Sequence, residues 1–347
     1  MERKDLILIL KYSLFFLFIL VLLFPGCEQY NEAERKVVHV YCAVDQVYSE
    51  PILKEFEQRT GIVIKAKFDV EAVKTVGLIN AIIAERNHPR CDVLWNNEVM
   101  HTISLKKMGL LYPYLSPSAE GIPDLFKDKE GFWTGIAARA RVIIYNEKIL
   151  RAEEAPHSIK DFLSPKWQGK GAIALPLFGT TATHAAALFS LWGEDEGRAF
   201  FRRLQKNGIV IAAGNAQVKD RVSSGELAFG LTDTDDANIA ILAGNPVKVI
   251  FPDQEGIGTL ILPNSIAMIK RCPHPEEAKI LIDYLLSKEV EEKLAWGRSA
   301  QMPLHSGVNR PLSMPSVNGM IAMRVGYEEM ADIYPRSSEV MKEIFLK

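Results

Sequence analysis

Three carboxylates stand almost side by side where an apolar run gives way to a helix-like run. The stretch FGLTDTDDANIA, residues 229–240, carries Asp233, Asp235 and Asp236. Neighbouring carboxylates repel one another unless solvent or a cation lies between them. Carboxylate oxygens are the ligands that hard metal ions prefer, and their negative charge also attracts ammonium groups. The stretch therefore predicts a cation-binding site.

Two other interpretations fit the same stretch. In the first, Thr234 is the N-cap of a helix whose first turn contains Asp235 and Asp236, so that both carboxylates complement the helix dipole. In the second, LTDTD resembles the nucleophile motif of haloacid-dehalogenase-like phosphatases, with Asp233 and Asp235 as the aspartate pair beside a Mg²⁺ ion. That family has Thr or Val where this chain has Ala237. Spacing alone leaves cation binding, capping and catalysis open.

A second cluster combines a glycine with hydroxyl groups and predicts an anion site. The segment PLFGTTATH places Gly179 just before Thr180 and Thr181 at an expected helix start. Unpaired N–H groups and the dipole at a helix start favour an anion, whereas simple N-capping by a threonine is the alternative. Asn215, in AAGNAQ, follows another expected strand and would add an amide.

The elements that must position these groups alternate short β-branched runs with amphipathic segments. VVHVYC, IVIKAKFD and DVLW form a βαβαβ unit, and GKGAIALP, IVIAAG and ELAFGLTD repeat the pattern. TLILPNSIAMIK is expected to return to the first lobe. Loops after parallel strands collect at one edge of a sheet, so Asp45, Asn97 and Glu98 are expected to face the aspartate cluster across a cleft.

The length of 347 residues exceeds what one core usually supports, which predicts two α/β lobes. We expect the N-terminal lobe to comprise residues 37–140 and about 259–310, and the C-terminal lobe to comprise about 141–258 and 311–347. Hinges are expected at the crossovers near Arg141 and Leu260. The formal net charge of −2 gives no reason to expect nucleic-acid binding.

The first 26 residues have a charged start followed by an apolar stretch, and they are interpreted as an export signal. The end of this stretch, LFPGC, resembles the lipobox of bacterial lipoproteins, which makes Cys27 the expected lipidation site. Residues 27–36 would then form a tether to a membrane, with the body of the protein in the cell envelope outside the cytoplasm. A plain transmembrane anchor is the alternative.

Three further cysteines, Cys42, Cys91 and Cys272, have no metal-like spacing. We expect all three to be small buried residues, with one disulfide as the alternative.

Nearly the whole chain after the tether resembles the periplasmic ferric-iron-binding proteins, which are solute receptors of ABC importers. The resemblance implies a two-lobed type II periplasmic-binding ("Venus flytrap") fold, each lobe a mainly parallel sheet flanked by helices. It rests on these segments: HVYCAVDQ, CDVLWNNE with KKMGLL, TGIAARARVIIYN, SPKWQGKGAIALPLFGTTATHAA, GNAQVKDRVSSGELAFGLTD and PNSIAMIKRCPHPEEAKILIDYLLS.

The resemblance also implies roles for individual residues. Asp45 stands where some relatives have a histidine ligand, and the family's glutamate falls on Asn97 or Glu98. Its anion contacts fall on the residues Gly179, Thr180, Asn215 and Arg139. Relatives carry Asn-Asn-Tyr-Tyr after the same strand, and the tyrosines bind iron; this chain has Asp235 and Asp236 at the tyrosine positions.

The predicted function is therefore capture of ferric iron or another hard cation, together with an anion, for delivery to an ABC permease and its ATPase. A small zwitterion such as an aminophosphonate is the alternative ligand, and a polyamine would use the acids but not the anion site. We expect a monomer without catalytic activity or a catalytic cofactor.

Overall fold

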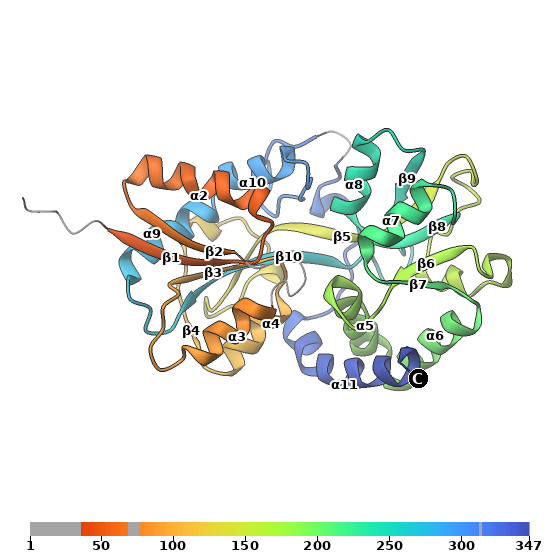
Figure 1. The fold of residues 1–347 in the computed structure, drawn as a ribbon, viewed down its shortest axis with the longest axis horizontal. Helices are drawn as coiled ribbons and strands as arrows, with labels where there is room; N and C mark the ends of the chain where they lie inside the picture. Colours follow the sequence, from red (N-terminus) through yellow and green to blue (C-terminus); the bar gives the residue numbers. More distant parts are fainter. Residues whose placement is uncertain (1–35, 69–75, 312–313, 347) are drawn as a thin grey trace, which may run out of the picture. The chain divides into compact units, whose positions relative to one another are not determined.

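The computed structural model describes residues 36–68, 76–311 and 314–346. The strands pair in the order β2-β1-β3-β10-β5-β8-β6-β7, with β4 added on β10 and β9 on β5 (Figure 1). The strands are β1 Val37–Cys42, β2 Val63–Phe68, β3 Val93–Asn96, β4 Leu111–Tyr112, β5 Thr134–Asn146, β6 Gly171–Ala174, β7 Val210–Ala212, β8 Phe229–Asp233, β9 Val247–Ile250 and β10 Ile261–Ile269.

Helices cover both sides of these strands. α2, α9 and α10 lie on one side of β1, β2 and β3, and α3 and α4 lie on the other (Figure 1). The helices are α2 Gln46–Thr60, α3 Val76–Ala84, α4 Met100–Lys107, α5 Gly179–Trp192, α6 Glu194–Lys206, α7 Asn215–Ser223, α8 Thr234–Leu242, α9 Pro275–Leu285, α10 Lys288–Trp296 and α11 Tyr327–Phe345. Short 3-10 helices span Pro117–Ala119, Asp124–Phe126, Ile159–Leu163, Pro165–Trp167 and Val317–Gly319.

The first βαβ unit shows how the sequence pattern produces this arrangement. Parallel pairing joins β1 to β2 and to β3, as the β-branched runs predict. Helix α2 buries Ile52, Leu53 and Phe56, and Gly61 ends it with a φ of 71°, a conformation that glycine adopts without strain. Pro51 lies inside α2 and not in its first turn, because α2 begins at Gln46, directly after Asp45.

The two long strands β5 and β10 connect the two halves of the sheet. Residues 134–140 of β5 pair with β10, whereas residues 141–146 pair with β8 and β9. The N–H of Arg141 donates to the carbonyl of Leu260 at 3.0 Å, so the two predicted hinge positions lie side by side. The lobe boundaries remain a prediction, since residues Val37–Lys347 form a single compact unit.

A buried polar network supports the crossover at β5. Ala137 has a φ of 40°, and the β5–β10 register shifts between Pro263 and Asn264. The carboxylate of Glu291, which is fully buried, accepts hydrogen bonds from the N–H of Ala137 at 2.8 Å and from Nδ1 of His305 at 2.9 Å. Its position makes Glu291 the main polar support of the irregular part of β5.

The predictions for the N-terminus and for Cys27 lie outside the described residues. Within the described part of the chain, no helix is long and apolar enough to cross a membrane. Cys42 and Cys91 are buried thiols, as predicted, but Cys272 is only partly buried because it lies in the turn after β10.

Candidate functional site

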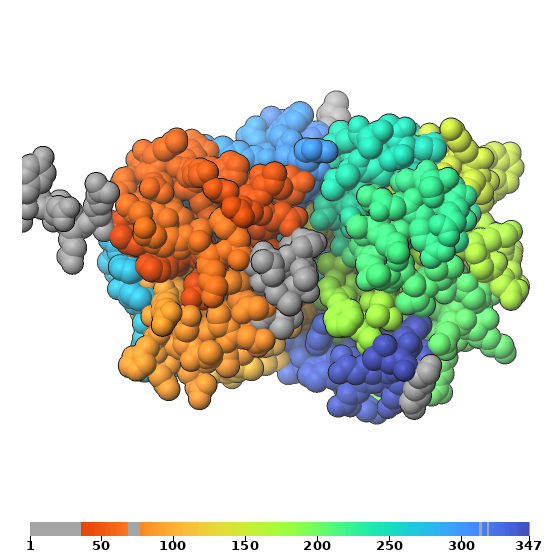
Figure 2. Space-filling model, in the orientation of Figure 1, coloured from red at the N-terminus to blue at the C-terminus, as the bar shows by residue number. Residues whose placement is uncertain are grey.

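The aspartate cluster lies where β8 ends and α8 begins. Strand β8 runs antiparallel to β5, and the register places Asp233 opposite Arg141. Arg139 precedes Arg141 by two residues, so the alternation of a strand places both guanidinium groups on one face of β5. The helices α7 and α8 that flank this region lie on the face shown in Figure 2. Two arginines and three aspartates therefore meet at one edge of the sheet.

Asp233 and Arg141 form a buried ion pair. Nη1 of Arg141 lies 2.6 Å from Oδ1 of Asp233, and the side chains are 0% and 2% exposed. Oδ2 of Asp233 accepts a hydrogen bond from Oγ1 of Thr180 at 2.7 Å and another from Nδ2 of Asn215 at 3.0 Å. Both carboxylate oxygens are thus engaged by groups of the protein itself.

The residues predicted to bind an anion surround this pair. Helix α5 begins at Gly179, whose φ is 55°, and no side chain caps its start. Arg141 donates to Oγ1 of Thr180 at 3.0 Å and to Oγ1 of Thr181 at 3.2 Å. It also donates to Oδ1 of Asn215 at 3.0 Å. The side chains of Thr180, Thr181 and Asn215 therefore meet around Arg141 and Asp233, and their predicted role in anion binding stays a prediction.

Asp235 and Asp236 occupy the first turn of α8, as the capping interpretation predicts. Thr234 is not the N-cap; it is the first helical residue, and its hydroxyl accepts from the N–H of Ala140 at 3.2 Å. The side chain of Asp235 is 22% exposed and lies 3.5 Å from Nη1 of Arg139. Asp233, Asp235 and Asp236 each offer an oxygen, and the three oxygens lie within 4.8 Å of one another.

The three carboxylates have different pKa values. Burial alone would raise the pKa of Asp233, but the charges of Arg141 and Arg139 hold it below its ordinary value. Burial raises the pKa of Asp235 against the opposing charge of Arg139. Burial, together with the charges of Asp235 and Asp233, raises the pKa of Asp236 to about 7. A cation placed among them would stabilise the ionised form of Asp236 in particular.

Arg139 connects this cluster to the loop after β3. Its Nη2 donates to the backbone carbonyl of Asn97 at 2.7 Å, and its side chain is 13% exposed. Burial alone lowers the pKa of the Arg139 guanidinium, yet the nearby carboxylates, Asp45 among them, raise it above its ordinary value. The backbone of Asn97 therefore contacts Arg139 beside the aspartate cluster, and the roles of Asp45 and Asn97 in ligand binding stay predictions.

Glu98 lies just before the start of α4. Its carboxylate accepts the backbone N–H of Met100 at 2.7 Å and that of His101 at 3.0 Å. The side chain thus satisfies the start of α4 and is mostly buried. Whether Glu98 also contacts a ligand stays a prediction.

Sequence reasoning missed Arg141 as a site residue and assigned it only to a hinge. The signal was present in AARAR, where two arginines stand two residues apart in a predicted strand. Strand periodicity sends both side chains to the same face, so a site built around Arg139 implies Arg141 as well.

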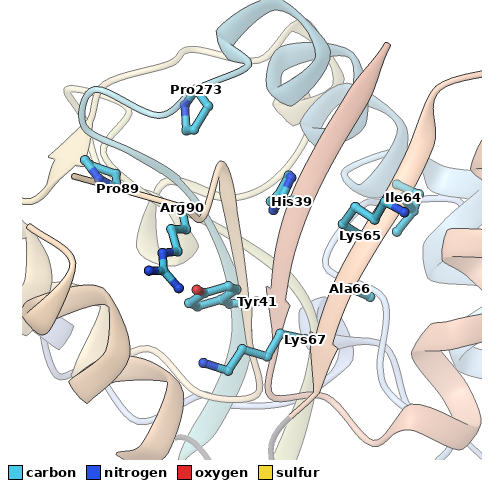
Figure 3. Close-up of a pocket in the computed structure, with 9 residues that line it drawn as sticks. All are labelled: His39, Tyr41, Ile64, Lys65, Ala66, Lys67, Pro89, Arg90 and Pro273. Carbon is cyan, nitrogen blue, oxygen red and sulfur yellow. The ribbon is translucent and has the colours of Figure 1, made fainter. Parts of the chain in front are cut away.

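A separate cavity of about 560 Å³ is lined by residues of β1 and β2. Figure 3 shows Lys67 and Arg90 reaching toward Tyr41 there, while His39 lies on the same strand as Tyr41. Nζ of Lys67 lies 4.8 Å from the centre of the Tyr41 ring. The lining residues come from β1, from β2 and from the segments before β3 and after β10, and none of them belongs to the aspartate cluster, so the two are distinct.

Comparison with known proteins gives one matching family model. It is described as "Bacterial extracellular solute-binding protein" and matches residues 100–331. The chain is similar to Iron uptake protein A1 of Synechocystis sp., with 25% identity over 322 residues, 89% of this chain and 87% of that protein. It is also similar to a putative 2-aminoethylphosphonate-binding periplasmic protein of Salmonella typhimurium, with 29% identity over 262 residues, 73% of each chain.

Solved structures with the same fold include iron-bound HitA from Pseudomonas aeruginosa. The TM-score is 0.79 at 22% identity, and the match covers 89% of this chain and 99% of that one. A Trichodesmium protein (IdiA, FutA) in complex with iron and citrate ligands matches with a TM-score of 0.79 at 19% identity, over 90% of this chain and all of that one. These likenesses confirm the predicted two-lobed type II periplasmic-binding fold.

Proposed function

Because the chain belongs to the bacterial extracellular solute-binding protein family, we propose that it captures a hard metal ion, such as ferric iron, at the aspartate cluster. The observation that carries this proposal is the approach of three carboxylate oxygens to within 4.8 Å of one another. Oxygen ligands at such spacing suit hard cations. The name of the similar Iron uptake protein A1 supports the same ligand class.

Asp235 and Asp236 are the proposed direct ligands, because each retains a carboxylate that the protein has not fully neutralised. Asp233 contributes its negative charge without being a direct ligand, because its oxygens already accept hydrogen bonds from Arg141 and Thr180. Asp45, Asn97 and Glu98 would add ligands from the neighbouring loops. Closure of the lobes around the ion would follow from the stronger binding of the ion to the closed state.

A second candidate ligand is a small zwitterion such as an aminophosphonate. The specific observation in its favour is Arg139, whose Nε has no hydrogen-bond partner among the described residues. A phosphonate on Arg139 would leave an ammonium group for Asp235 and Asp236, and the Salmonella typhimurium relative carries such a name. A polyamine fits less well, because Arg139 would repel it.

In the proposed setting, the protein is tethered through Cys27 outside the cytoplasm and delivers its ligand to an ABC permease driven by an ATPase. It acts as a monomer and performs no chemistry on the ligand. Phosphatase chemistry has little support, because the oxygens of Asp233 are occupied by Arg141, Thr180 and Asn215.

Elemental analysis of the purified protein, followed by calorimetric titration, tests the proposed ligand. The titrants are Fe³⁺-citrate, Mn²⁺, Ca²⁺ and 2-aminoethylphosphonate. Saturable binding of a metal ion supports the first candidate, whereas binding of 2-aminoethylphosphonate alone would replace it with the second.

A further inference from the structure

Asp233 is held by its neighbours in the way that a protein holds a bound anion. Its carboxylate accepts from the guanidinium of Arg141 at 2.6 Å, the hydroxyl of Thr180 at 2.7 Å and the amide of Asn215 at 3.0 Å. Nη1 of Arg139 lies 3.8 Å away. The residue is 1% exposed, so the contacts are shielded from water. Three hydrogen-bond donors, from β5, α5 and α7, thus converge on one carboxylate, and Arg139 of β5 adds a second positive charge beside it.

The same donors would make a receptor for a small anion from solution. Guanidinium groups bind planar carboxylate-like anions strongly, and the uncapped start of α5 adds a favourable dipole. The sequence analysis assigned Thr180, Asn215 and Arg139 to such an anion. In the structure, the side chain of Asp233 takes that place, and the hydroxyl of Thr181 is already used by Arg141.

We propose that Asp233 is a built-in anion, so that the protein binds a hard cation without recruiting a companion anion from solution. The inference rests on the proposed function and narrows its ligand to the cation itself. Asp233 precedes Asp235 by two residues, and its oxygen lies within 4.8 Å of those of Asp235 and Asp236. Its charge therefore sits beside the proposed ligands without the entropic cost of capturing a free ion.

A built-in anion has a consequence for specificity: a metal that arrives as a complex with citrate or carbonate must dissociate from that anion before it binds. An added anion would have to displace Asp233 from Arg141, which would leave a buried carboxylate unpaired. Removing one partner of a buried ion pair is strongly unfavourable, because the charge left behind is uncompensated. Asp233 is therefore expected to keep its place against an added anion.

The test measures cation affinity of the purified protein with and without a candidate anion. Terbium(III) chloride, followed by luminescence, and manganese(II) chloride, followed by calorimetry, are titrated in a carbonate-free buffer. The titrations are repeated with bicarbonate and with sulfate. The expected result is a Kd that changes less than about threefold on adding either anion. A cation that binds only when an anion is present would overturn the inference while the proposed function stood.

The Asp233→Asn variant tests whether the charge of Asp233 is needed, because the substitution keeps the side-chain shape and removes the charge. We expect its affinity in carbonate-free buffer to fall about tenfold or more, and bicarbonate or sulfate to restore part of the loss. Asp220→Asn, an exposed aspartate of α7, is the matched control and should bind as the wild type does. Asp233→Asn binding as tightly as the wild type would contradict the proposal.

Two further measurements distinguish a failure of Asp233→Asn to fold from a failure of the proposed function. Thr180→Val removes one donor to Asp233 but leaves its charge, so binding should remain independent of added anions. This variant keeps the inference testable if Asp233→Asn does not fold, as judged by circular dichroism. A wild-type protein that binds neither Tb³⁺ nor Mn²⁺ in any buffer would overturn the proposed function and this inference together.

Discussion

Nη1 of Arg141 lies 2.6 Å from Oδ1 of Asp233, in a pair that joins β5 to β8 and is shielded from solvent. Removing two charges from water is costly, so such a pair persists only when its remaining polar atoms also find partners. Thr180, Thr181 and Asn215 supply those partners. The site is thus organised around an internal ion pair, and the proposed ligands are Asp235 and Asp236, which follow it in the sequence.

The first prediction concerns the stability of this pair. Asp233→Ala should lower the free energy of unfolding by about 3–5 kcal/mol, because it leaves the charge of Arg141 buried and unpaired. The double variant Arg141→Met/Asp233→Leu should recover most of that loss, since it removes both charges. Urea unfolding of the single and double variants measures the difference, with the exposed Asp220→Ala as control. A double variant less stable than Asp233→Ala would contradict this account.

A second prediction concerns Glu291, which supports the irregular part of β5. Its carboxylate accepts from the N–H groups of Ala137, Leu304 and His305 and from the His305 ring. Glu291→Gln turns one acceptor oxygen into a donor facing other donors, so we expect a loss of about 2–4 kcal/mol in unfolding free energy. Thermal melting of the wild type and of the Glu291→Gln variant tests this predicted loss of stability. Glu196→Gln, an exposed residue of α6, should leave the melting temperature unchanged.

The third prediction is a pH effect through His184 on α5. Burial, with a smaller contribution from the charge of Arg141, lowers the pKa of this ring from 6.5 to about 3. Above pH 6.5 the ring is neutral in the folded and unfolded chains alike. Between pH 6.5 and 3 the unfolded chain takes up a proton that the folded chain does not, so acid favours unfolding by up to about 1.4 kcal/mol per pH unit.

Urea unfolding across this pH range tests the effect with His184→Gln, which cannot be protonated. The variant should lose stability less steeply than the wild type as the pH falls from 6.5. His88→Gln removes an exposed histidine and should follow the wild-type slope. Parallel slopes for the wild type and His184→Gln would show that another group controls the acid sensitivity.

Much of the fold follows from the sequence because its signals are local. The β-branched runs and the amphipathic segments between them correspond to β1, β2, β3, β6, β7 and β8 and their helices. Gly61 ends α2 where its freedom to adopt positive φ is needed. The start of α2 does not follow from the sequence alone, because Pro51 by itself favours a first helical turn, whereas the chain is already helical from Gln46.

The site was only partly predictable, because its contacts depend on register. The sequence placed Asp233, Thr180 and Asn215 at or after the ends of strands, and the structure brings their side chains into contact. It gave no means of pairing Asp233 with Arg141, because the two are 92 residues apart and their contact depends on how β5 aligns with β8. Thr180 and Asn215 were therefore identified, but Arg141 and the carboxylate that the three residues hold were not.

The most direct measurement is the metal affinity of the wild type and of the Asp235→Asn/Asp236→Asn variant, determined by calorimetric titration with Fe³⁺-citrate and Mn²⁺. The account predicts saturable, equimolar binding to the wild type and a loss of about tenfold or more in the variant, because both proposed ligands lose their charge. The control, Asp332→Asn on the exposed surface of α11, should bind as the wild type does. Absence of binding by either metal, or equal affinity of the wild type and the double variant, would contradict the claim that this aspartate cluster holds a hard cation.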